Sequence, residues 1–221
     1  MKTKLILLAG LLSAGLLTSS AQVVLTNQHV DIGVAFEDGA WNLHIHDETN
    51  DIEYKPDDAV LLVGSVARTT VPNDPAYSFL GRAGRPIWIL PQVQNEALLF
   101  LGFGAEEIPP GLFLNDALDL KLKKVRGPGH FTVWDLDAFG NPVVIMNTRD
   151  RVRTNDVFHG VAGSHQDLNW GFSQPGRYRV TFEATATLAD GTPVSSGEVT
   201  YTFRVQRADR PHAPRPNRDE L

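Results

Sequence analysis

Apolar and polar side chains alternate along much of this chain, and that alternation predicts short β-strands. The longest example covers residues 178–187, where every second side chain from Tyr178 to Ala186 is apolar or small. A turn sequence, DGTP at residues 190–193, follows it and precedes a second alternating run at residues 199–205. Because glycine and proline favour tight turns, this order predicts a hairpin with one buried and one solvated face.

The same pattern recurs upstream. Residues 86–103 are also apolar, but Pro86 and Pro91 predict an edge strand or a loop there, since proline cannot donate to a strand ladder. Residues 115–124 are the stretch most easily mistaken for a helix, and their alternation favours a strand. Further strands are predicted at residues 41–46, 118–123, 131–133 and 143–146, with a turn at residues 137–142.

Strands at short intervals, without long helical periodicity between them, predict an all-β fold. We expect an immunoglobulin-like antiparallel β-sandwich in the last hundred residues, with an N-terminal β extension packed on it. No linker rich in Ser, Gly or Pro separates the two halves, so residues 22–206 are predicted to form a single domain.

The two ends of the chain have a different character. Lys2 and Lys4 precede a short apolar run and the small residues Ser19, Ser20 and Ala21, which is the pattern of a cleaved signal peptide over residues 1–21. That run is too short to span a bilayer. Residues 207–221 are rich in Arg and Pro and are predicted to be a disordered tail. We therefore expect a secreted, periplasmic or cell-envelope protein without membrane insertion.

Composition excludes several functions. The chain has 20 Lys and Arg against 26 Asp and Glu, a formal charge of −6, so nucleic acid is not an expected partner. It has no cysteine, which excludes disulfides, thiolate metal sites and cysteine nucleophiles. It also lacks the G-x-S-x-G and H-E-x-x-H motifs, and we predict that it is not an enzyme. The adjacent carboxylates Glu106 and Glu107 are interpreted as solvated surface, because neighbouring strand residues point to opposite faces.

The histidines carry the main functional signal. His44 and His46 are two residues apart on a predicted strand, so both imidazoles project from one face, with Cα atoms about 6.5–7 Å apart. His165 and Asp167 repeat this geometry. If the two strands are neighbours, these four side chains form a tetrahedral site, with His29 as a substitute or fifth ligand. Zinc is the expected ion and copper(II) its competitor. The alternative is that the histidines are ordinary polar-face residues of amphipathic strands.

Six segments along the chain carry a family resemblance. They are, in order, HVDIG (29–33), WNLHIHD (41–47), PIWILPQ (86–92), DAFGNP (137–142), NWGF (169–172) and PGRYRVTF (175–182). Together they resemble the bacterial surface-anchored repeat domain of choice-of-anchor M proteins. The resemblance implies an exported or wall-attached β module, and it implies a metal-transport or envelope protein as a partner. The family often has H-x-H where this chain has His165-Gln166-Asp167. The chain's end carries neither a membrane helix nor a sorting motif, so free secretion or periplasmic residence is expected.

Three functions are compatible with these observations. The leading hypothesis is an exported, non-catalytic module of the cell envelope that binds zinc or copper. The alternative is a structural or adhesive β-sandwich that binds a protein or glycan without metal, with residues 77–91 as its most suggestive surface. The third is a metallohydrolase with an open coordination position, for which no general base is evident beside the ligands. The metal ligands predicted by the leading hypothesis are His29, His44, His46, His165 and Asp167.

Overall fold

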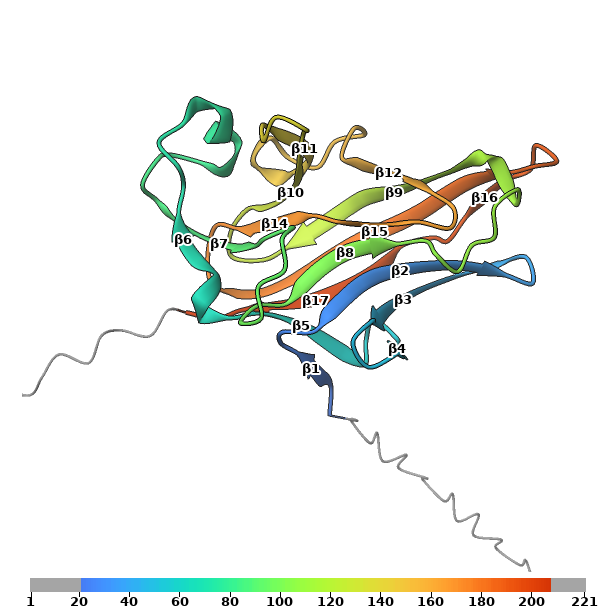
Figure 1. The fold of residues 1–221 in the computed structure, drawn as a ribbon, viewed down its shortest axis with the longest axis horizontal. Coiled ribbons are helices and arrows are strands. Elements are labelled where there is room, and N and C mark those ends of the chain that lie inside the picture. Colours follow the sequence, from blue (N-terminus) through green and yellow to red (C-terminus); the bar gives the residue numbers. More distant parts are fainter. Residues whose placement is uncertain (1–20, 208–221) are drawn as a thin grey trace, which may run out of the picture.

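The computed structural model describes residues 21–207, and these residues form an almost entirely β structure (Figure 1). Apart from Ala21 and Arg207, the predicted signal peptide and tail lie outside the described residues. No helix in the described part of the chain is long and apolar enough to cross a membrane. The only helices there are 3-10 turns at Ser65–Ala67, Pro75–Leu80 and Thr148–Asp150.

One layer of the fold is a seven-stranded sheet. Its strands follow the order β1-β5-β17-β15-β9-β12, and β16 pairs with β15. Most neighbours are antiparallel, but β5 runs parallel to both β1 and β17. The strands are β1 (Val23–Leu25), β5 (Ala59–Val63), β9 (Phe113–Arg126), β12 (Val157–Val161), β15 (Gly176–Leu188), β16 (Pro193–Ser195) and β17 (Val199–Val205).

Two five-stranded sheets complete the fold. The first has the order β11-β10-β14-β7-β6 and the second β13-β8-β2-β3-β4. Strands β13 and β14 follow each other in the chain, so they connect the two sheets. The strands of the first are β6 (Arg68–Thr70), β7 (Pro86–Leu90), β10 (Phe131–Leu136), β11 (Pro142–Asn147) and β14 (Asn169–Phe172). Those of the second are β2 (His29–Glu37), β3 (Ala40–Asp47), β4 (Ile52–Tyr54), β8 (Phe100–Gly104) and β13 (His165–Asp167).

A single large core joins the seven-stranded sheet to both smaller ones. Phe103 of β8 meets Phe182 of β15, and Trp170 of β14 meets Phe203 of β17, with ring centroids 5.5 and 5.9 Å apart. All four side chains are almost completely buried. The prediction of an all-β sandwich is therefore confirmed, and the immunoglobulin-like arrangement is compatible with it. Residues before 105 contribute strands to all three sheets, rather than only covering one face of the rest.

Most predicted strands are present. The hairpin partners are β15 and β17, which pair antiparallel from Gly176 opposite Val205 to Phe182 opposite Val199. The stretch that could have been a helix lies within β9, as its alternation predicted. The sequence pattern did not predict the short strand β16, which pairs with the far end of β15 after the turn.

The expectation of an edge strand or loop at residues 86–103 holds for the loop at residues 91–99 and is wrong for the two strands that flank it. Strand β7 is interior, paired with β14 on one side and β6 on the other, and β8 is interior between β13 and β2. Proline is tolerated because Pro86 is the first residue of β7 and Pro91 follows its last, so neither interrupts the middle of a ladder.

A tyrosine fixes the start of β15. The Tyr178 hydroxyl donates a hydrogen bond to the Gln174 carbonyl at 2.8 Å, and the side chain is completely buried. A Cβ on Gly127 would collide with its ring, so the chain needs glycine there. A buried tyrosine bonded to backbone a few residues upstream is the tyrosine corner of Greek-key sandwiches. This contact is one reason why the fold is compatible with an immunoglobulin-like arrangement.

Candidate metal centre

The candidate ligands gather on the outer face of the sheet formed by β13, β8, β2 and β3. Along β2, Ile32 and Val34 point into the core, so the alternate residue Asp31 points outward. The ladder places Asp31 opposite His46 of β3 and, through Gly102 of β8, in the same row as Asp167 of β13. The next row contains His44, Gly33, Gly104 and His165.

Three glycines make room for these side chains. A Cβ on Gly33 would collide with the imidazole of His44. A Cβ on Gly102 would lie 2.5 Å from Asp31 Oδ1, and one on Gly104 would lie 3.0 Å from Asp31 Oδ2. Imidazole and carboxylate groups therefore lie directly against the backbone of β2 and β8. This explains why glycine occupies positions in the middle of strands, where it is otherwise unfavourable.

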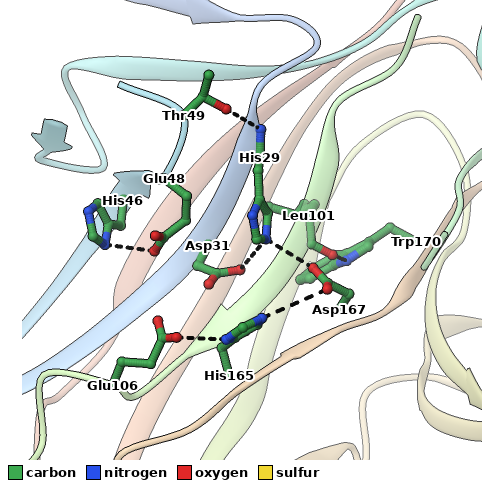
Figure 2. A network of polar contacts seen from close by, with 10 residues as sticks. All are labelled: His29, Asp31, His46, Glu48, Thr49, Leu101, Glu106, His165, Asp167 and Trp170. Atoms are coloured by element: carbon green, nitrogen blue, oxygen red, sulfur yellow. Dashed lines mark hydrogen bonds and ion pairs between the residues drawn. The ribbon is translucent and has the colours of Figure 1, made fainter. Parts of the chain in front are cut away.

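The first cluster combines His29, His165 and Asp167 with Asp31 (Figure 2). His29 Nε2 lies 3.1 Å from Asp167 Oδ1 and 4.0 Å from Asp31 Oδ1. His165 Nε2 lies 3.9 Å from the other Asp167 oxygen. One ligand atom from each of His29, His165 and Asp167 can be chosen so that all lie within 4.8 Å of one another. Asp31 adjoins this group, because one of its oxygens lies within 4.8 Å of ligand atoms of His165 and Glu106.

Asp31 is the least hydrated member of this cluster. It is 1% exposed, and neither carboxylate oxygen has a hydrogen-bond partner among the described residues. Burial raises the pKa of Asp31 to about 6, although the neighbouring His29 and His165 oppose the rise. A buried carboxylate without hydrogen bonds is costly unless a cation accompanies it. A cation bound beside Asp31 would therefore stabilise the folded cluster.

Glu106 orients His165. Its Oε1 lies 2.6 Å from His165 Nδ1, which leaves Nε2 on the side of Asp167. Burial disfavours a charged His165, but the hydrogen bond and charge of Glu106, with Asp31 and Asp167, outweigh it and raise the pKa of His165 above its usual 6.5. A carboxylate on the far nitrogen is the usual arrangement around a metal-binding histidine, because it fixes the ring and makes it more basic.

The second cluster contains His44, His46 and Glu107. His44 Nε2 lies 3.1 Å from Glu107 Oε1, and His46 Nδ1 lies 2.9 Å from Glu48 Oε1. His44 is 2% exposed, whereas the side chain of His46 is 21% exposed. The two rings lie 6.1 Å apart, as expected for alternate residues of one strand.

The two predicted ligand pairs therefore belong to neighbouring clusters rather than to one tetrahedral set. His29 joins His165 and Asp167 as predicted, but no group of candidate ligands within 4.8 Å in the described chain mixes these with His44 or His46. The reason is topological, because β8 and β2 separate β13 from β3.

Three carboxylates were not predicted as part of the site. Glu106 and Glu107 are exposed, as predicted, but they follow the end of β8, and each contacts a different histidine. Asp31 was detectable as the only charged side chain within the otherwise apolar or small stretch from Val30 to Phe36.

The aromatic stretch at residues 77–91 lines a separate pocket of about 550 Å³. Leu80 and Trp88 are buried, but Arg82, Arg85 and Arg149 are exposed at its wall. None of the three arginines forms an ion pair with a carboxylate of the described residues. The pocket is therefore cationic.

Comparison with known protein families found no matching family, and comparison with curated proteins found no match either. The resemblance to choice-of-anchor M proteins therefore stays a prediction from the motifs quoted above. The functional argument depends on the geometry of the clusters.

Proposed function

We propose that this protein is an exported module that binds a divalent transition-metal ion through His29, Asp31, His165 and Asp167. The observation that carries the proposal is the completely buried, unpartnered carboxylate of Asp31 facing two imidazoles and a second carboxylate. A cation bound to Asp31 compensates its buried negative charge and so offsets the cost of that burial.

The donor set supports zinc, with copper(II) as the competitor. Two nitrogens and two oxygens suit a four-coordinate zinc ion with bonds of about 2.0–2.1 Å. Ligand atoms on such an ion lie about 3.3 Å apart, by the geometry of a tetrahedron with those bonds. The separations of 3.1 Å between His29 and Asp167, 3.9 Å between His165 and Asp167 and 4.0 Å between His29 and Asp31 lie within about 0.7 Å of this value.

A binding role is favoured over catalysis at this cluster. Four protein ligands close the coordination shell of zinc, whereas catalytic zinc keeps one position for water. The apparent export signal at residues 1–21 supports a role outside the cytoplasm or in the cell envelope. A metal-transport or envelope protein is the partner class that this combination favours.

The test is zinc binding by protein made from the full-length gene without a histidine tag. After dialysis against zinc and removal of free metal, elemental analysis should find bound zinc. The double variant H165A/D167N should lose the equivalent held by this cluster. The matched control is His159→Ala, since His159 is exposed and pairs with Asp119 on the seven-stranded sheet. Wild-type protein that retains no zinc would overturn the proposal.

The cationic pocket supports a second candidate function, adhesion to an acidic glycan. Its three arginines supply planar donors that suit carboxylate or sulfate groups. Immobilised heparin can serve as the probe, with metal chelated to separate the two functions. The triple variant R82A/R85A/R149A should elute at lower salt than wild type. Equal elution of the two proteins would refute this candidate.

A further inference from the structure

We infer that His44, His46 and Glu107 form a second cation site, separate from the one proposed above. It shares no ligand with the first cluster, so it goes beyond the proposed function. The ion would be a divalent transition metal, as two imidazoles and one carboxylate are ligands of zinc and copper(II).

The buried state of His44 is the first observation. The residue is 2% exposed, and neither ring nitrogen forms a hydrogen bond with any described residue. Buried polar side chains almost always have such a partner. Gly33 provides the space in which this ring lies, because any side chain there would collide with it. The fold thus holds a buried imidazole against the backbone of Gly33, with Glu107 as the carboxylate that contacts it among the described residues.

The contact between His44 and Glu107 is the second observation. Nε2 and Oε1 are 3.1 Å apart, yet the nitrogen is not hydrogen-bonded, because the angles are unsuitable. Two ligands of one ion have this relation, since both direct their lone pairs at the metal rather than at each other. His46 is flanked by two further carboxylates, with Glu48 Oε1 2.9 Å from its Nδ1 and Asp51 Oδ1 3.6 Å from its Nε2.

The charge of the whole face is the third observation. Its two clusters bring six carboxylates close to four histidines. Asp31 lies opposite His46 in the ladder, so the clusters are neighbours on one sheet, and Figure 2 shows His46 and Glu48 beside the first cluster. One divalent ion leaves most of this negative charge uncompensated, whereas two ions neutralise four of the six carboxylates. The carboxylates are Asp31, Glu48, Asp51, Glu106, Glu107 and Asp167.

The two sites differ in the number of protein ligands. The second has three, so zinc bound there keeps a position for water or for a donor from another molecule. Glu107 is also partly exposed, with 32% of its side chain accessible. We therefore assign the exchangeable ion to the second site and the retained ion to the first.

The experiment is a zinc titration of the full chain without a histidine tag, with stoichiometry measured by elemental analysis and competition with a chromophoric chelator. Wild type should bind two equivalents, the weaker of which is removed first by the chelator. The variant H46A/E107Q, which leaves the buried His44 in place, should bind one equivalent, and H165A/D167N should also bind one. His159→Ala should bind two. Far- and near-ultraviolet circular dichroism of each variant shows that it is folded.

The outcomes separate the two proposals. One wild-type equivalent that is lost in H165A/D167N and kept in H46A/E107Q overturns the second site and leaves the proposed function intact. If wild type binds one equivalent and each variant by itself abolishes that binding, the two clusters form a single shared site, which also overturns this inference. No bound zinc in wild type overturns both.

Discussion

Replacing Asp31 by Asn should make the metal-free protein more stable and the metal-bound protein less so. The buried carboxyl of Asp31 has its pKa raised from 3.8 to about 6, chiefly by burial. Above pH 6 the group is ionised in both the folded and the unfolded chain, and the folded state bears the cost of burying the charge. The asparagine side chain is close in shape but uncharged, so it removes that cost.

The pKa shift sets the magnitude. A rise from 3.8 to about 6 corresponds to about 3 kcal/mol of unfolding free energy. Because the folded pKa is raised, the stability of the wild type should fall as pH rises from about 4 to about 6 and then level off as far as Asp31 is concerned. At pH 7.5 in chelator, Asp31→Asn should therefore be more stable than wild type by up to about 3 kcal/mol, and this difference should shrink towards pH 4.

Bound zinc should reverse the order of stability of wild type and Asp31→Asn. Zinc at 1,000 times its Kd adds about 4 kcal/mol to the stability of a protein that binds it only when folded. The variant Asp31→Asn lacks one ligand, so zinc should add less to its unfolding free energy. The assay is urea unfolding of both proteins at several pH values in chelator, and at pH 7.5 with excess zinc. Asp167→Asn is the control, since Asp167 is partly exposed and contacts His29, so its loss should not stabilise the apoprotein.

A different result would refute this reasoning. If Asp31→Asn destabilises the apoprotein equally at pH 4.5 and pH 7.5, then Asp31 has a structural role that does not depend on its charge. The difference between wild type and variant is the quantity to compare, because the raised pKa of His165 also makes stability depend on pH.

Three further predictions concern other residues. Gly33→Ala should displace the ring of His44 and lower zinc stoichiometry from two to one, and an unchanged value in elemental analysis would argue against the second site. Glu106→Gln should weaken zinc binding about 10- to 100-fold in competition titrations, because it removes the charge that supports a ligand imidazole; equal affinity would contradict that role. Tyr178→Phe should cost about 1 kcal/mol in urea unfolding, whereas Tyr201→Phe should cost nothing or stabilise, because only the Tyr178 hydroxyl has a partner among the described residues. Equal losses in both would count against this account.

The alternation of side chains was enough to predict the strands that carry the site. His44 and His46 do share one face of β3, and His165 and Asp167 share one face of β13, because the side-chain period of a strand is two whatever the tertiary structure. The same rule predicted β9, β15 and β17. Strand formation and the face on which each side chain lies are local properties, so the local sequence is enough to predict them.

Strand neighbours were not predictable in this way. Nothing in residues 29–33 indicates that they pair in parallel with residues 100–104, and this pairing is what inserts two strands between the predicted ligand pairs. The roles of Glu106 and Glu107 depend on how the chain leaves β8 and returns towards the sheet. Asp31 is recognisable in the sequence as the single charged residue of an apolar strand. Its role as a candidate ligand becomes evident only when the neighbouring strands are known.

The parallel pairing of β2 with β8 also determines when the site can exist during folding. His29 and Asp167 are 138 residues apart in the chain, and β8 must lie between their strands before they meet. Contacts of such long range form late, because closing large loops costs entropy before any contact compensates for it. An ion at the first site therefore cannot nucleate the sheet. If the proposed function is right, its binding would report that folding from β2 to β13 is complete, and the chain would acquire the metal of the compartment in which it finishes folding.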